Sequence, residues 1–163
     1  MNPDTIIYIQ KPYTADHIPK EQTLISWATM ALRHELKRNQ PIEIVVRIVD
    51  EIESADLNSR YRYKQGPTNV LSFPFEQTMH SNLLGDIVIC APLVKKEADT
   101  QDKITEAHWA HLVIHGCLHL LGFDHLNDND AEIMETLEIK LLNSLGFANP
   151  YQLPSETMVN NPT

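Results

Sequence analysis

The sequence predicts a single domain of the α+β class, in which helices cover a small mixed sheet of about four strands. The 163-residue chain has the length of one domain and shows neither an internal repeat nor a Gly/Ser-rich linker. Its first half contains several short runs rich in β-branched residues, and its second half shows mainly the 3.6-residue apolar periodicity of helices.

The four expected strands are 5–10, 42–49, 69–75 and 84–90. The second is the most strongly β-branched of them, which is typical of a buried strand. Pro74 lies in the third and cannot donate a hydrogen bond to a neighbouring strand. This strand is therefore expected at an edge of the sheet or at a bulge.

Two helices are expected in the first half of the chain. Pro19 can open the first, which should cover the sheet with the apolar residues Leu24, Trp27, Ala28, Ala31 and Leu32. The second is a short helix over 54–61 with Ser54 as its N-cap. The basic residues Arg60, Arg62 and Lys64 lie at its end and just beyond it.

The second half predicts two longer helices, one from about 104 to 121 and another from 131 to 145. Gly122 and Gly146 follow them directly and suit left-handed C-caps. The second helix has an expected capping pair, Asn129 with Glu132, and an inward apolar stripe, Met134, Leu137, Leu141 and Leu145. We expect residues 1–146 to form the domain, with 147–163 as a loosely ordered, proline-containing C-terminal tail.

Composition excludes several classes of function. The chain has 13 Lys and Arg against 22 Asp and Glu, a net charge of −9, which argues against nucleic-acid binding through the overall charge of the protein. A protein of this charge that binds nucleic acid needs a local basic patch. No apolar run approaches the roughly 18 residues of a membrane span, and no secretory signal is recognisable, which predicts a cytoplasmic protein without a membrane partner. Two cysteines are too few for a disulfide framework or a four-thiolate zinc site.

Histidines form the main candidate site. At about 100° per residue, His108, His111, His115 and His119 share one face of the 104–121 helix. His115 and His119 form an i, i+4 pair, and a chain that turns back at Gly122 can bring His125 to the same point. Three neutral imidazoles suit zinc and leave one coordination position open, as in catalytic zinc sites. The alternative is a solvated helix face without metal.

The sequence leaves the roles of the other polar residues around this motif open. His108 and His111 are expected to support a ligand, to face substrate or to lie on the polar surface, and His111 is a possible proton acceptor. Asp124 could orient a ligand or serve as a turn residue. Cys117 lies on the opposite side of the helix from His115 and is expected in the core.

The spacing H-x-x-x-H-x-x-G-x-x-H is that of metzincin metallopeptidases, in which a glutamate directly follows the first histidine as general base. Gly116 occupies that position here. A peptidase needs this carboxylate to activate its zinc water, so the sequence argues against ordinary peptide hydrolysis.

Three blocks together resemble the YbeY family, bacterial endoribonucleases that mature ribosomal RNA. They are the histidine segment 115–125, the segment 61–74 around Tyr61-Arg62-Tyr63-Lys64 and Pro67-Thr68-Asn69, and the segment 84–89. The resemblance extends in order over residues 44–146. It implies a zincin-like fold with a metal site at the end of a central helix.

The resemblance also implies the residues of the site. One zinc ion per chain would be held by His115, His119 and His125, and the expected catalytic residues are Arg62 and His115. The residue chemistry is compatible, because an arginine clamps a phosphate with a planar fork of donors. Without the flanking block, Arg62 would be interpreted as a surface arginine paired with an acid.

The leading hypothesis is a metal-dependent, single-strand-specific endoribonuclease that processes the 3′ end of small-subunit (16S) ribosomal RNA and acts in small-subunit quality control. The resemblance implies ribosomal RNA, the small subunit and its proteins, and a ribosome-associated GTPase as partners. Two alternatives remain open at this point: a non-catalytic ribosome-assembly factor, and a metallohydrolase acting on peptides or small molecules.

Overall fold

A computed structural model describes residues 5–35, 41–76 and 82–152 of the chain. The strands are β1 (Thr5–Gln10), β2 (Ile42–Val49), β3 (Val70–Pro74) and β4 (Leu83–Cys90). The helices are α1 (Glu21–Glu35), α2 (Glu51–Arg62), α3 (Ala91–Thr100), α4 (Thr105–Leu120) and α5 (Asp128–Ser144). The predicted α+β class with a four-stranded mixed sheet is confirmed.

The sheet has the strand order β1-β2-β4-β3. Strands β1, β2 and β4 run parallel to one another, whereas β3 pairs antiparallel with β4. Strand β3 thus forms one edge of the sheet, which is the edge position that Pro74 predicted.

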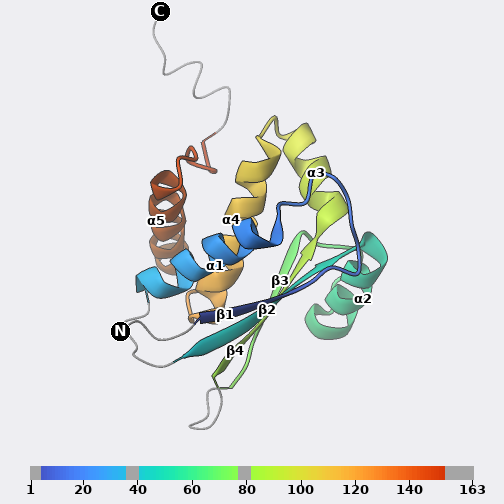
Figure 1. Cartoon of the computed structure of the whole chain (residues 1–163), viewed down its shortest axis with the longest axis horizontal. Coiled ribbons are helices and arrows are strands. Elements are labelled where there is room, and N and C mark those ends of the chain that lie inside the picture. The colour runs from blue at the N-terminus through green and yellow to red at the C-terminus, as the bar shows by residue number, and fades with distance from the viewer. Residues whose placement is uncertain (1–4, 36–40, 77–81, 153–163) are drawn as a thin grey trace, which may run out of the picture.

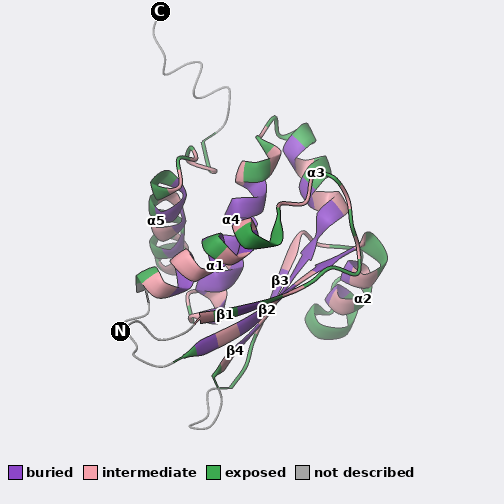
Figure 2. Cartoon of the chain, in the orientation of Figure 1, coloured by how far each residue is buried: buried purple, intermediate pink, exposed green. Residues whose placement is uncertain are grey.

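Helices cover both faces of the sheet, but unequally (Figure 1). Helices α1 and α4 pack over one face and α5 lies on the outer side of α4, whereas α2 lies against the opposite face. The buried residues follow this arrangement: a large core lies between the sheet and α1, α4 and α5, and a smaller one forms under α2 (Figure 2). Within the described ranges, no helix is both long and apolar enough to cross a membrane.

The structure differs from the sequence prediction at three helices, α3, α2 and α5. Helix α3 was not predicted; it begins directly after β4 and has Pro92 in its first turn, where the missing N–H is tolerated. Helix α2 begins at Glu51 because Asp50, not Ser54, is its N-cap and accepts a hydrogen bond from the Glu53 N–H at 2.9 Å.

Helix α5 likewise begins earlier than predicted, at Asp128. Its N-cap is Asn127, whose side-chain oxygen accepts a hydrogen bond from the Asp130 N–H at 2.8 Å, so Asn129 lies inside the helix. Met134 and Leu141 of the predicted inward stripe are buried, and Leu137 and Leu145 pack partly buried against the core.

The first residues after Gly146 lie against the domain. The Phe147 ring meets the Trp27 ring edge-on, with 6.1 Å between ring centroids, and the Tyr151 hydroxyl hydrogen-bonds to Glu138 on α5. Residues 153–163, the greater part of the predicted tail, lie outside the described residues. The division into a domain ending at 146 and a loose tail stays a prediction.

Candidate active site

The C-terminal end of α4 turns the chain back on itself. Gly122 adopts a φ of +103°, a left-handed conformation that favours glycine. The Gly122 N–H donates to the His119 carbonyl and the Phe123 N–H donates to the Leu118 carbonyl, each at 3.0 Å. These two bonds form a Schellman motif, which ends the helix and sends the following residues, including His125, back beside its last turn.

The turn brings three imidazoles together. The His115 and His119 Nε2 atoms lie 3.1 Å apart, and the His125 ring centroid lies 5.6 Å from that of His115 and 5.0 Å from that of His119. One ring nitrogen of each residue lies within 4.8 Å of the others. Two ligands of a tetrahedral zinc ion would be about 3.3 Å apart, given Zn–N bonds of about 2.05 Å. The three side chains therefore fit a small divalent ion.

Burial keeps one of these imidazoles neutral. The pKa of His119 is lowered to about 4, chiefly because burial disfavours the charged form and further because of His115 and His125 nearby. At neutral pH, His119 is therefore unprotonated, which is the form that binds metal. Asp124 acts as a turn residue, since its carboxylate accepts a hydrogen bond from the His125 backbone N–H at 2.8 Å.

A buried glutamate supports His115 from behind. Glu138 on α5 is fully buried, and its Oε1 atom lies 2.5 Å from the His115 Nδ1 atom. Burial by itself raises the pKa of Glu138, but hydrogen bonds from His111 and His115 outweigh it and lower this pKa to about 2. Glu138 is thus an anion at neutral pH, and it can only accept hydrogen bonds.

Two of the four histidines on the predicted stripe do not reach the triad. His108 is buried, with its Nε2 atom 2.9 Å from the Glu97 Oε1 atom, and His111 is buried, with its Nε2 atom 2.9 Å from Glu138 Oε2. Helices α3 and α5 carry these two carboxylates and cover that part of α4. His111 therefore neither lies on a polar surface nor lines the cavity described next, which disfavours it as a proton acceptor for substrate.

His111, His115 and Glu138 form a second group whose ligand atoms lie within 4.8 Å of one another. Its contacts have the lengths of hydrogen bonds, and both carboxylate oxygens are engaged. The group is also more enclosed than the triad, because Glu138 and His111 are buried whereas His125 is exposed. The triad is the better candidate for a metal that must contact substrate.

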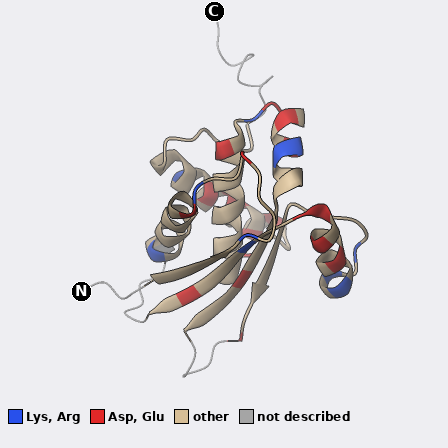
Figure 3. Cartoon of the chain, turned by 45° about the vertical axis from the view of Figure 1, so that its right-hand side comes forward, with Lys and Arg blue, Asp and Glu red and all other residues tan. Residues whose placement is uncertain are grey.

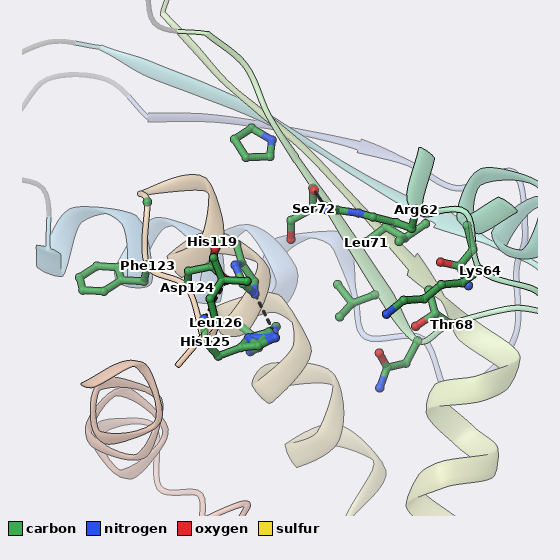
Figure 4. A pocket seen from close by; sticks show the side chains of 16 residues that line it. Arg62, Lys64, Thr68, Leu71, Ser72, His119, Phe123, Asp124, His125 and Leu126 are labelled. Carbon is green, nitrogen blue, oxygen red and sulfur yellow. Dashed lines mark hydrogen bonds between the residues drawn. The ribbon is translucent and has the colours of Figure 1, made fainter. Parts of the chain in front are cut away.

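A cavity of about 680 Å³ joins the triad to the basic segment around Arg62. Figure 4 shows Arg62 and Lys64 on one side and His119 and His125 on the other. The remaining lining includes Asn58, Thr68, Asn69, Ser72 and Phe123. Lys and Arg residues occur at the end of α2 and in the loop after it, although the chain as a whole is acidic (Figure 3). The cavity thus combines a local positive charge with a candidate metal centre.

Neighbouring groups orient Arg62 toward this cavity. Its Nη2 atom donates to the Ser72 backbone carbonyl at 2.6 Å, and its guanidinium carbon lies 5.9 Å from the centre of the Phe73 ring. No ion pair of Arg62 with an acid occurs among the described residues, unlike Arg60, which pairs with Asp56 at 3.1 Å. The described part of the structure thus gives no support to the alternative in which Arg62 is paired with an acid.

Two buried polar residues of α2 shape the loop that follows it. The Ser54 hydroxyl hydrogen-bonds to the Thr68 backbone carbonyl at 2.8 Å and accepts from the Thr68 N–H at 3.0 Å. The Asn58 side chain donates to the Gly66 carbonyl at 2.8 Å. These bonds fix the loop that carries Lys64 and Thr68 into the cavity.

Packing explains why Gly116 stands where metallopeptidases have glutamate. A Cβ atom at this position would lie 2.9 Å from the Ile87 Cγ2 atom on β4, closer than side chains tolerate. Helix α4 therefore rests on the sheet at Gly116, and the position is buried.

We expect Gly116→Glu to destabilise the protein by about 3 kcal/mol or more, because it overpacks the contact with Ile87 and buries a carboxylate. Urea unfolding measures the loss, and Asn143→Glu, at an exposed position of α5, is the matched control. A Gly116→Glu variant that is as stable as the control, or that acquires peptidase activity, would contradict this account.

Sequence reasoning missed two residues that support the site, Glu138 and Tyr151. The signal for Glu138 was present: it follows Met134 by four residues on the inward stripe of α5, where an isolated acid requires partners. Nothing local to Tyr151 indicated that its hydroxyl would reach Glu138, since 13 positions separate the two residues.

Comparisons with known proteins identify the family of the chain and support its fold. The family model of endoribonuclease YbeY matches residues 9–146, which include Arg62, the three histidines and Glu138. The chain is also similar to the solution structure of TM1509 from Thermotoga maritima, with a TM-score of 0.56 and 24% sequence identity over 90% of this chain and 99% of that one. This second likeness supports the fold. Because the family model spans most of the chain, the protein belongs to the YbeY family of endoribonucleases.

Proposed function

We propose that the protein is a metal-dependent endoribonuclease that cuts single-stranded ribosomal RNA, with the precursor 3′ end of 16S ribosomal RNA as substrate. Membership of an endoribonuclease family gives the reaction class, hydrolysis of an RNA phosphodiester. The observation that carries the proposal is the cavity shared by Arg62, Lys64, His115, His119 and His125. It brings a phosphate-binding group and candidate metal ligands to the same substrate.

In this proposal, His115, His119 and His125 hold one zinc ion. A bound zinc ion supplies a Lewis acid that polarises a phosphoryl oxygen and lowers the pKa of water. Arg62 binds the scissile phosphate and stabilises the charge that develops on it, because among the described residues only one acceptor, the Ser72 carbonyl, engages its N–H donors. Holding the guanidinium on the Ser72 carbonyl reduces the reorganisation needed when RNA binds.

The preference for single strands follows from charge and shape. With a net charge of −9, the chain lacks the broad basic surface that would hold a long duplex. A short single strand can enter a cavity and present one phosphate to Arg62. Proteins of the small subunit and a ribosome-associated GTPase are the proposed partners that would deliver the RNA, in maturation and in small-subunit quality control.

The test is cleavage of a single-stranded RNA that matches the 3′ end of precursor small-subunit RNA. Protein stripped by a chelator should lose cleavage, and added Zn²⁺ should restore it, because the histidines alone supply no Lewis acid. Metal-loaded protein should leave an unstructured peptide intact. RNA binding without metal-dependent turnover would instead indicate an assembly factor, and cleavage of the peptide but not the RNA would indicate a peptidase.

A further inference from the structure

The buried carboxylate of Glu138, on α5, has three hydrogen-bonding partners, two from α4 and one from the C-terminal segment. Its Oε1 atom meets His115 Nδ1 at 2.5 Å, and its Oε2 atom meets His111 Nε2 at 2.9 Å and also accepts from the Tyr151 hydroxyl. Burying a carboxylate without such partners costs several kcal/mol. The three hydrogen bonds therefore offset the cost of burying the Glu138 carboxylate, and each of its oxygens has at least one partner.

The contact with Glu138 selects the tautomer of His115. A carboxylate oxygen accepts hydrogen bonds, so the 2.5 Å contact with Oε1 favours the tautomer of the His115 ring that carries its proton on Nδ1. The lone pair is then on Nε2, the atom that lies 3.1 Å from His119 Nε2 within the triad. A carboxylate hydrogen-bonded to the far nitrogen of a ligand histidine fixes its ring orientation and raises its basicity.

Tyr151 contacts the Glu138 oxygen that does not contact His115. Its hydroxyl contacts Glu138 Oε2 and lies 3.2 Å from His111 Nε2, and its ring stands edge-on to the His111 ring with 5.3 Å between centroids. The segment that carries it is itself anchored: the Tyr151 N–H donates to the Asn149 side-chain oxygen at 2.8 Å, and the Phe147 N–H donates to the Leu142 carbonyl at 2.9 Å.

Tyr151 also lies beyond the part of the chain that the family model matches, which ends at residue 146. We propose that Tyr151 is a positioning residue for the metal site, acting through Glu138 on the ligand nitrogen of His115. The C-terminal segment thereby takes part in the active site without touching substrate. The inference rests on the proposed metal-binding role of the triad.

The experiment measures Zn²⁺ affinity by competition with a chromogenic chelator, for Tyr151→Phe, Glu138→Gln and the double variant. We expect Tyr151→Phe to weaken binding about 10-fold and Glu138→Gln 10- to 100-fold, the range for loss of an outer partner of a ligand histidine. Because Tyr151 acts through Glu138, the tyrosine change should have less than a twofold effect in the Glu138→Gln background. Tyr8→Phe, at an exposed tyrosine on β1, is the matched control.

Unchanged affinity of Tyr151→Phe, or an equal loss in both backgrounds, would overturn the proposal. Tyr151 is 41% exposed, so the removal of its hydroxyl should leave a folded protein even if Glu138→Gln does not fold. A purely structural role would lower the melting temperature of Tyr151→Phe without changing zinc affinity.

A second readout does not depend on metal. Nitrogen-15 NMR of metal-free protein should show His115 protonated on Nδ1 in the wild type and a mixture of tautomers in Tyr151→Phe. If the wild type fails to bind zinc, the proposed function is wrong, and this tautomer shift alone decides the role of Tyr151. An identical tautomer in both proteins would then refute it.

Discussion

Arg62→Ala should reduce kcat/KM for single-stranded RNA by about 100-fold or more while leaving zinc affinity unchanged. Removal of a single preorganised donor to a developing negative charge lowers rates by roughly 100- to 1000-fold. The guanidinium lies against Ser72 and Phe73 and contacts none of the three histidines, so the metal centre should be unaffected. Steady-state cleavage and a zinc titration measure the two effects separately.

Arg60→Ala is the matched control for Arg62→Ala. Arg60 is on the same helix, pairs with Asp56 and does not line the cavity, so its loss should change cleavage by less than about twofold. Arg62→Lys should recover only part of the activity, since an ammonium cannot bind the Ser72 carbonyl and a phosphate with one planar fork. Full activity of Arg62→Ala, or a loss of zinc, would refute the role assigned to Arg62.

His119→Ala should abolish metal-dependent RNA cleavage and weaken zinc binding by more than the roughly 100-fold that loss of an outer partner costs. His119 belongs to the triad, and the pKa of its imidazole is lowered to about 4, so it is available as a neutral ligand at pH 7. Zinc content after dialysis and cleavage by identically purified proteins give the two measurements.

His34→Ala, at an exposed residue in the last turn of α1, is the control for the histidine change. It should retain both zinc and cleavage. If His119→Ala still cuts RNA, the activity comes from a contaminating nuclease or from another site, and the proposed metal centre is not catalytic.

The grouping of the triad could be predicted from the sequence because its geometry is local. The i, i+4 spacing of His115 and His119 stacks them on one helix face, and Gly122 forms a turn whose two hydrogen bonds join residues five or fewer positions apart. The strands and the edge position of β3 could be predicted for the same reason, since β-branched runs and Pro74 act through their own backbone.

The surroundings of the triad were decided by the tertiary structure. The helix wheel placed His108 and His111 on one stripe with His115, but helices α3 and α5 bring Glu97 and Glu138 against them and exclude them from the cavity. Helical periodicity identifies which residues share a face, whereas only packing determines which neighbour covers each part of it.

Residue patterns along the chain were enough to predict the class of fold, the helix and turn that bring the triad histidines together, and the family to which the chain belongs. Three features depend on long-range packing: Arg62 faces the histidines across a cavity, Ile87 leaves no room for a side chain at Gly116, and Glu138 with Tyr151 lies behind His115. Local hydrogen bonds and side-chain periodicity are encoded within a few residues. Contacts between distant segments depend on how whole elements pack, which no short stretch of sequence specifies.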